Sequence, residues 1–213
     1  MAKYFSDQSS CVQKQFLTKR TAIELGSGNG FLSVCLLAAL INRDGEFDET
    51  QKSDHNNMFK NYVGLNRLVI TDFSDHLPLI EKTLEANPSI IEDAKARNMD
   101  IEVVKHEWGI FPTCGDDDES RNVLCRDETF DFIFGSDLAY RSTLHEPLIK
   151  SLKRFSHDKT VILIGITMND TPSSFFDKLS DAGFSYERLN DCLMDPKFRG
   201  QTFGLFAVQK KKH

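Results

Sequence analysis

The sequence predicts an α/β protein built on a largely parallel sheet with helices on both faces. Short apolar runs alternate with segments of helical periodicity along most of the chain. The first apolar run breaks into glycines before a helix, and two late apolar runs close the chain as a terminal strand pair. Ligands of such sheets bind outside the carboxyl ends of the strands, where the strand order reverses.

The first half of the chain is expected to form three strands, at residues 22–25, 68–71 and 101–104. Residues 31–41 are apolar almost all round, which is typical of a helix packed on several sides. Two further helices are expected at residues 74–87 and 90–97, because apolar residues recur there at helical spacing and Pro88 separates them.

The second half begins with a strand at residues 130–135 and continues with one at residues 161–166. The helix between them carries an apolar face of Leu144, Leu148, Leu152 and Phe155. Thr171 and Pro172 are interpreted as the N-cap and the first position of the next helix, which Gly183 can close. The last two strands are expected at residues 184–189 and 203–208.

Composition indicates one globular domain spanning residues 1–213. The 213 residues are 40% hydrophobic and 27% charged, with a net charge of −6, so nucleic acid is an unlikely partner. No apolar run reaches the roughly 20 residues of a membrane span, and the start lacks the apolar core of a signal peptide. A cytoplasmic location is expected, with the nucleus left open. The five cysteines are odd in number and form no C-x-x-C pair, which favours reduced structural thiols.

Two long polar stretches interrupt the pattern, at residues 42–67 and 113–129. The first lies at the edge opposite the expected site and is interpreted as a solvated insertion. The second contains the acidic run 116–119, which could attract a basic substrate but is more typical of a solvated loop.

The glycine motif lies in TAIELGSGNGF, residues 21–31. A phosphate loop would need a lysine after Gly30, and a dinucleotide fingerprint would need a glycine where Phe31 stands. What remains is E-x-G-x-G-x-G, in which the glycines let the backbone approach a ligand and Glu24 suits a cationic, amine-bearing one. A tight strand-to-helix turn without a ligand is the alternative.

Two further residues follow predicted strands at the same edge. Asp72 ends the second strand, where a carboxylate can accept both hydroxyls of a ribose, although it could instead cap the helix starting near Ser74. Trp108, the only tryptophan, follows the third strand, where its indole could pack on a purine or in the core.

The motifs TAIELGSGNGF, LVITDF, VVKHEWG and FDFIFGSDLAY occur in the order found in seven-β-strand S-adenosylmethionine-dependent methyltransferases. The chain most closely resembles their methyltransferase-like protein-lysine methyltransferase family, from about residue 21 to the terminal FGLFAVQKKK. This resemblance implies a Rossmann-like seven-stranded sheet, mostly parallel with an antiparallel last strand. It also implies S-adenosyl-L-methionine as cofactor and a protein substrate, such as a cytosolic chaperone or translation factor.

The resemblance also implies roles for individual residues. The cofactor-binding set is Glu24, Gly26, Ser27, Gly28, Asp72, Phe73, Trp108 and Ser136. Within it, Asp72 would hold the ribose, while Phe73 and Trp108 would lie at the adenine. Glu107 is a weaker candidate for the adenine amino group.

Asp137 and Tyr140 match the D-x-x-Y motif of the family's active site. In this hypothesis Asp137 binds the incoming lysine ammonium and Tyr140 positions its nitrogen. Asp137 could instead cap the helix from Arg141 onward, and Tyr140 could simply pack. Two other functions stay open: a methyltransferase for arginine, histidine or a small molecule, and a non-catalytic binding module.

The sequence departs from this family in three places. Relatives usually carry more chain before the first motif, including a tryptophan that closes over the cofactor, and Tyr4 or Phe5 is the candidate substitute here. The insertion at residues 42–67 lengthens the path to the second strand. After the fifth strand, ITMND stands where relatives often place charged residues.

Overall fold

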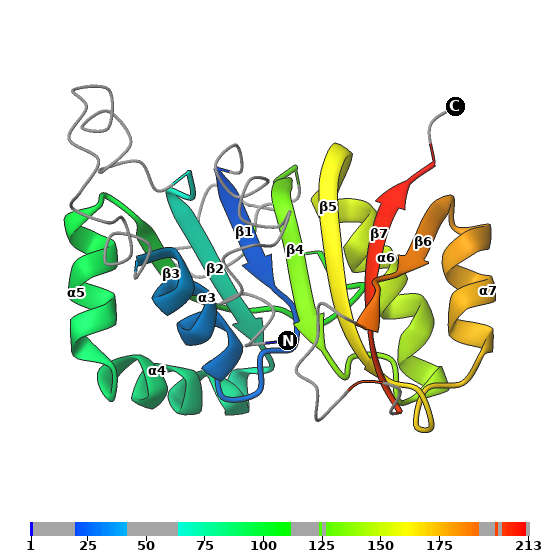
Figure 1. The fold of residues 1–213 in the computed structure, drawn as a ribbon, viewed down its shortest axis with the longest axis horizontal. Helices are drawn as coiled ribbons and strands as arrows, with labels where there is room; N and C mark the ends of the chain where they lie inside the picture. Colours follow the sequence, from blue (N-terminus) through cyan, green and yellow to red (C-terminus); the bar gives the residue numbers. More distant parts are fainter. Residues whose placement is uncertain are drawn as a thin grey trace.

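The computed structural model describes residues 1, 20–41, 64–111, 124, 127–191, 199 and 202–211. Their central feature is a seven-stranded sheet with the order β3-β2-β1-β4-β5-β7-β6, shown edge to edge in Figure 1. The strands are β1 (Thr21–Glu24), β2 (Arg67–Asp72), β3 (Asp100–Lys105), β4 (Phe130–Ser136), β5 (Ser156–Thr167), β6 (Phe184–Arg188) and β7 (Phe203–Lys210).

Five strands of this sheet are parallel. β1 pairs with β2 and β4, β2 pairs with β3, and β4 pairs with β5, all in the same direction. β7 is antiparallel to both β5 and β6, between which it lies. The predicted fold class, mostly parallel with an antiparallel last strand, is confirmed.

The helices cover the two faces of the sheet in separate groups. One group consists of α3 (Phe31–Ile41), the short 3₁₀ helix η3 (Ser74–His76), α4 (Leu77–Glu85) and α5 (Pro88–Ala96). The other consists of η4 (Ser142–Leu144), α6 (His145–Phe155) and α7 (Ser174–Asp181). Figure 1 shows the first group beside β1 to β3 and the second beside β5 to β7.

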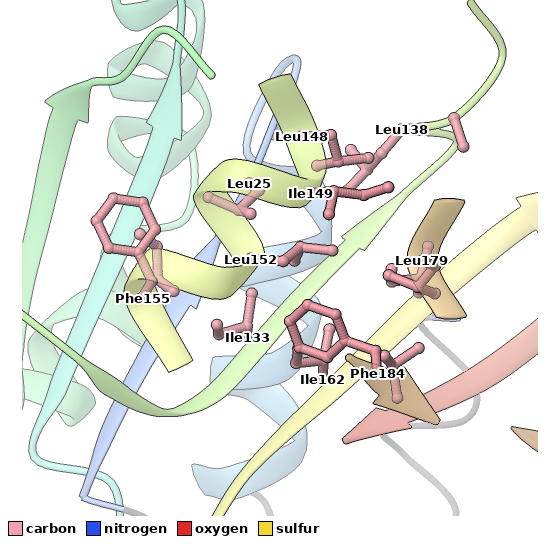
Figure 2. Close-up of a cluster of buried hydrophobic side chains, with 14 of the residues drawn as sticks. Leu25, Ile133, Leu138, Leu148, Ile149, Leu152, Phe155, Ile162, Leu179 and Phe184 are labelled. Carbon is pink, nitrogen blue, oxygen red and sulfur yellow. The ribbon is translucent and has the colours of Figure 1, made fainter. Parts of the chain in front are cut away.

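Alternate residues of the central strands supply the two cores. Ile23 and Ile133 belong to the cluster under α6 and α7, whereas Ala22 and Phe132 belong to the cluster under α3, α4 and α5. Successive side chains of a strand point to opposite faces, so these short runs must be apolar throughout. Figure 2 shows the apolar residues of α6 packed across β4, with Leu152 near Ile133.

Most predicted elements are present with small changes at their ends. The helix over residues 31–41 has the predicted bounds. The helix predicted at residues 74–87 divides into η3 and α4 and ends at Glu85. β5 begins at Ser156 instead of residue 161, because Ser156 pairs with Phe130 before a register shift in β4.

The predicted start of the last helix is wrong. α7 begins at Ser174, and its N-cap is Ser173, which makes no side-chain capping bond. The Phe175 N–H donates to the Pro172 carbonyl (3.0 Å), so Thr171 and Pro172 form a turn that precedes the helix. Gly183, with φ 92°, follows the helix as predicted.

Several sequence predictions fall outside the described residues. They concern Tyr4 and Phe5, residues 42–63 of the polar insertion, and the acidic run 116–119. Within the described ranges, no helix is both long enough and apolar enough to cross a membrane.

Candidate active site

The strand order reverses between β1 and β4. The chain moves outward from β1 to β3 and then returns to the other side of β1 to form β4. Loops that leave the carboxyl ends of these two parallel strands diverge, which opens the crevice where ligands of this architecture bind. The segments at this crevice are the glycine loop (residues 25–30), the tryptophan loop (residues 106–111) and the acceptor turn (residues 137–140).

The glycine loop needs glycine for two different reasons. Gly26 and Gly28 both have left-handed φ angles, 59° and 61°. A Cβ on Gly26 would lie 2.8 Å from Trp108 Cζ2 and 3.0 Å from Leu138 Cδ2, so the other two segments pack directly on this residue. A Cβ on Gly28 would have no heavy atom within 4 Å. Gly26 therefore joins the three segments, while Gly28 leaves its backbone accessible.

Ser27 lies between these glycines, and its side-chain hydroxyl is buried without a hydrogen bond to the described residues. Its N–H donates to the Thr71 carbonyl (2.9 Å), which ties the loop to β2. Its Oγ is buried and has no hydrogen-bond partner among the residues that the structure describes. Because a buried hydroxyl is stabilised by a partner, this atom is suited to receive a polar group of a ligand.

Glu24 lies beneath the loop. Its side chain is buried, and its carboxyl accepts a hydrogen bond from the Ser33 hydroxyl of α3. Burial raises the pKa of Glu24 to about 8, with the nearby Asp72 adding to the effect. The carboxyl is thus mostly protonated at neutral pH, so the sequence-based picture of an anion facing a cationic ligand does not hold for this conformation. A direct contact between Glu24 and a cofactor stays a prediction.

Asp72 connects the glycine loop to η3. Its Oδ2 accepts from the Gly28 N–H (2.7 Å), and its Oδ1 accepts from the Phe73 N–H (2.7 Å) and lies 2.8 Å from His76 Nδ1. The N-cap of η3 is Phe73, and no side-chain capping bond is formed there or at α4. The helix-cap alternative for Asp72 is therefore wrong. The Phe73 ring is 47% exposed and available to a planar ligand.

Trp108 lies partly in the core, and its packing on a purine stays a prediction. Its half-buried ring packs against the core under α6 and also approaches Gly26. The neighbouring Glu107 is exposed. The indole thus lies beside the glycine loop, where a flat ligand could contact it.

The acceptor turn begins with a strained residue. Asp137 has φ 56°, a left-handed conformation that costs a non-glycine residue roughly 1–2 kcal/mol. Its Oδ1 accepts from the Thr167 Oγ1–H (2.7 Å) and N–H (3.1 Å), and its Oδ2 accepts from the Ser136 hydroxyl (3.3 Å). Strain held by so many contacts is typical of a functional site.

The remaining residues of the turn point in different directions. Leu138 is buried against the glycine loop, whereas the Tyr140 ring is 50% exposed, with the Arg141 guanidinium 5.3 Å from its centroid. No side-chain capping bond forms at the start of η4 or α6, so Asp137 is not a helix cap. Tyr140 is not simply a core residue either.

Several residues that shape the site were missed from the sequence. Thr71 donates its hydroxyl to the Glu24 carbonyl (2.7 Å), and Ser33, His76 and Thr167 contact the acidic residues described above. Each is a single polar residue that belongs to no recognisable motif. Among them, only Thr167 could have been suspected as a site residue, because it lies at the end of the fifth strand.

Several solved structures with a similar fold are methyltransferases. The ribosomal protein L11 methylase of Lactobacillus delbrueckii subsp. bulgaricus is 17% identical, with a TM-score of 0.55, covering 94% of this chain and 75% of that one. An O-methyltransferase family protein from Burkholderia thailandensis is 14% identical, with a TM-score of 0.58, covering 100% of this chain and 55% of that one. An O-methyltransferase from Bacillus cereus in complex with S-adenosylhomocysteine is 15% identical, with a TM-score of 0.50, and the match covers 99% of this chain and 80% of that one. At these identities the likeness establishes the fold.

Sequence comparison identifies the family. No curated protein matches the chain. A family model described as lysine methyltransferase matches residues 1–182, which include the glycine loop, the tryptophan loop and the acceptor turn. The chain therefore belongs to the lysine methyltransferase family, and its cofactor is S-adenosyl-L-methionine.

Proposed function

We propose that this protein is a protein-lysine N-methyltransferase acting on a cytosolic protein, such as a chaperone or a translation factor. The observation that carries the proposal is the direct packing of the acceptor turn on the glycine loop. Leu138 Cδ2 lies 3.0 Å from the position that a Gly26 Cβ would take, so the D-x-x-Y motif packs on the glycine loop, as a shared site requires. We place this activity in the cytoplasm, with the nucleus as a second location.

The residues of the glycine loop fit the cofactor. The buried, unpartnered Ser27 hydroxyl can bind a polar group of the ligand, and the open side of Gly28 allows close approach to the backbone. Asp72 makes three hydrogen bonds, one with Gly28 of the glycine loop and two with Phe73 and His76, which hold its carboxylate at the carboxyl end of β2 for a ribose. When bound, the cofactor supplies an electrophilic methyl group on a sulfonium.

The acceptor turn provides what an amine substrate needs. A lysine ammonium has a reference pKa near 10.4 and must lose a proton before its nitrogen can attack carbon. Asp137 Oδ1 is occupied by Thr167, whereas Oδ2 accepts only a long bond from Ser136 and can bind the incoming ammonium. Tyr140 is a half-exposed residue, and its hydroxyl can orient the nitrogen as the proton leaves to solvent.

Exposure of the acceptor turn favours a protein over a small molecule as substrate. Asp137 and Tyr140 both lie at the surface, where a long lysine side chain presented by another protein can reach them. A small acceptor would be expected to bind in a more enclosed pocket.

The proposal is tested by incubating the purified protein with labelled cofactor and a cell extract. Mass spectrometry of the labelled product then identifies the methylated residue and the protein that carries it. We expect methyl-lysine in a protein band with the parent chain and a large loss of label with Asp137→Ala. Calorimetry with S-adenosylhomocysteine accompanies both samples.

The alternatives give different results in the same experiment. Label on arginine, histidine or a small molecule would replace the lysine assignment while keeping the methyltransferase. Cofactor binding without any transfer would favour a non-catalytic binding module. Full transfer by Asp137→Ala would remove Asp137 from the catalytic residues.

A further inference from the structure

Helix α6 carries two fully buried polar side chains in an otherwise apolar face. His145 and Ser151 are both 0% exposed, beside the core residues Leu148, Leu152 and Phe155. Figure 2 shows these apolar neighbours packed against the sheet. Buried polar groups lower stability unless they are hydrogen-bonded, so the partners of these two residues indicate why they are present.

Ser151 binds the tryptophan loop. Its Oγ accepts from the Gly109 N–H (2.9 Å) and forms a hydrogen bond with His106 Nε2 (2.9 Å). Burial lowers the pKa of His106 to about 4, so its ring is neutral at neutral pH. The hydroxyl thus holds the His106 ring on one side of Trp108 and the Gly109 backbone on the other.

Packing reinforces this attachment. The His106 and Phe111 rings lie 4.9 and 5.7 Å from the Phe155 ring of α6. A Cβ on Gly109, which has φ 78°, would lie 3.1 Å from Pro147 Cα. The tryptophan loop therefore rests on α6 along much of its length.

His145 binds the acceptor turn. Its Nε2–H donates to the Ala139 carbonyl (2.8 Å), one residue before Tyr140. Its Nδ1 is buried and has no partner among the described residues, so the ring makes a single hydrogen bond at the cost of one unsatisfied atom. Packing alone would be served better by an apolar residue, which indicates that the bond to Ala139 is what His145 contributes.

We propose that α6 is a shared support for the two sides of the active site, with Ser151 positioning Trp108 and His145 positioning Tyr140. The two residues act on different loops from one helix. This inference rests on the proposed roles of Trp108 in cofactor binding and of Tyr140 in acceptor binding. Neither His145 nor Ser151 touches substrate or cofactor in this account, so both are positioning residues.

The first test measures hydrogen exchange by mass spectrometry in Ser151→Ala, His145→Leu and the parent. We expect Ser151→Ala to speed exchange in residues 106–111 and to leave residues 137–141 near the parent rate. His145→Leu should give the reverse pattern. Ile149→Ala is the matched control, because it removes a buried apolar contact of the same helix without a hydrogen bond to either loop.

The second test measures function in the same variants. Ser151→Ala should weaken S-adenosylhomocysteine binding about fivefold, because the tryptophan loop loses its hydrogen bonds from Gly109 and His106, and should shift the emission of Trp108, the only tryptophan. His145→Leu should leave the S-adenosylhomocysteine affinity and the Trp108 emission unchanged. It should lower the rate of methyl transfer into extract proteins about fivefold. His145→Gln, which keeps an N–H donor of similar reach, should retain more transfer than His145→Leu.

The outcomes that overturn the inference are specific. Equal exchange patterns in Ser151→Ala, His145→Leu and Ile149→Ala would mean that α6 acts only through stability. Equal loss of transfer in His145→Gln and His145→Leu would remove the Ala139 bond from the explanation. Exchange, fluorescence and calorimetry require no acceptor, so they decide the inference even if the parent methylates no lysine.

Discussion

The cofactor side and the acceptor side of this site are built in opposite ways. The glycine loop and Asp72 are joined by bonds between backbone N–H groups and buried acceptors, including Gly28 to Asp72 and Ser27 to Thr71. The acceptor turn is exposed and begins at a left-handed Asp137, whose N–H donates to the Gly165 carbonyl, and it adds side-chain contacts from Thr167 and His145. Backbone interactions suit a ligand shared by a whole family, while side-chain interactions can change with the acceptor.

The largest expected effect comes from the residue where the two sides meet. Gly26→Ala would place a methyl group against Trp108 and Leu138, in addition to strain from its left-handed φ. We expect the free energy of unfolding to fall by about 2–5 kcal/mol, as left-handed strain and overpacking add. Gly28→Ala shares the strain without the clash, so denaturant unfolding should show a loss of only about 1–2 kcal/mol. Equal losses in the two variants would contradict the close packing at Gly26.

The next largest effect is expected on cofactor affinity, where Asp72 is compared with a neighbouring exposed carboxylate. Asp72→Ala should lower the affinity for S-adenosylhomocysteine about 10- to 100-fold in calorimetry, because charge-assisted hydrogen bonds would be lost. Asp75→Ala removes an exposed carboxylate from the adjacent turn and should leave the affinity near the parent value. An unchanged affinity in Asp72→Ala would remove Asp72 from the pocket.

Glu24 should make stability depend on pH in a defined direction. Its pKa is raised to about 8 in the folded protein from an ordinary value of 4.5, so the unfolded chain ionises first as pH rises. The folded state therefore binds more protons between pH 4.5 and 8, and stability falls across this range. Glu24→Gln cannot ionise, so its stability relative to the parent should increase between pH 5 and pH 8.5 in denaturant unfolding. A difference that does not change with pH would argue against a buried, protonated Glu24.

The smallest effect concerns the support of Asp137. Thr167→Val removes the hydroxyl that donates to Asp137 Oδ1 and keeps the N–H donor and the branched shape. We expect methyl transfer to fall about fivefold while S-adenosylhomocysteine affinity stays within twofold, because one hydrogen bond is lost on the acceptor side only. Weakened cofactor binding in this variant would mean that the two sides are not separable.

Much of the fold could be predicted from local sequence patterns. The apolar runs of β1, β2 and β4 are buried on both faces, so their hydrophobicity identifies them without knowledge of their partners. The early start of β5 could not be predicted, because Ser156 joins the sheet through pairing with Phe130 and not through its own sequence. The start of α7 was missed because a Thr-Pro pair fits a turn as well as a helix N-terminus.

The site was predictable where a residue followed a strand and unpredictable where it acted through a neighbour. Asp72, Trp108 and Asp137 were expected at one edge because carboxyl ends of parallel strands share it, and they follow β2, β3 and β4 there, while their roles stay predictions. Ser151 is distant in sequence from the tryptophan loop, and although His145 is close to the acceptor turn, nothing in an amphipathic helix distinguishes a supporting polar residue from a tolerated one. The charge of Glu24 was misjudged because burial, which only the fold reveals, controls its pKa.

The most direct test of the two-sided site is the Asp137→Asn variant, measured for both binding and transfer in one preparation. Asparagine tolerates the left-handed φ of Asp137, so the turn should keep its shape while the charge is lost. We predict an S-adenosylhomocysteine affinity equal to that of the parent and a methyl-transfer rate at least about tenfold lower. Parent-level transfer, or a loss of cofactor affinity as large as the loss of transfer, would contradict the account.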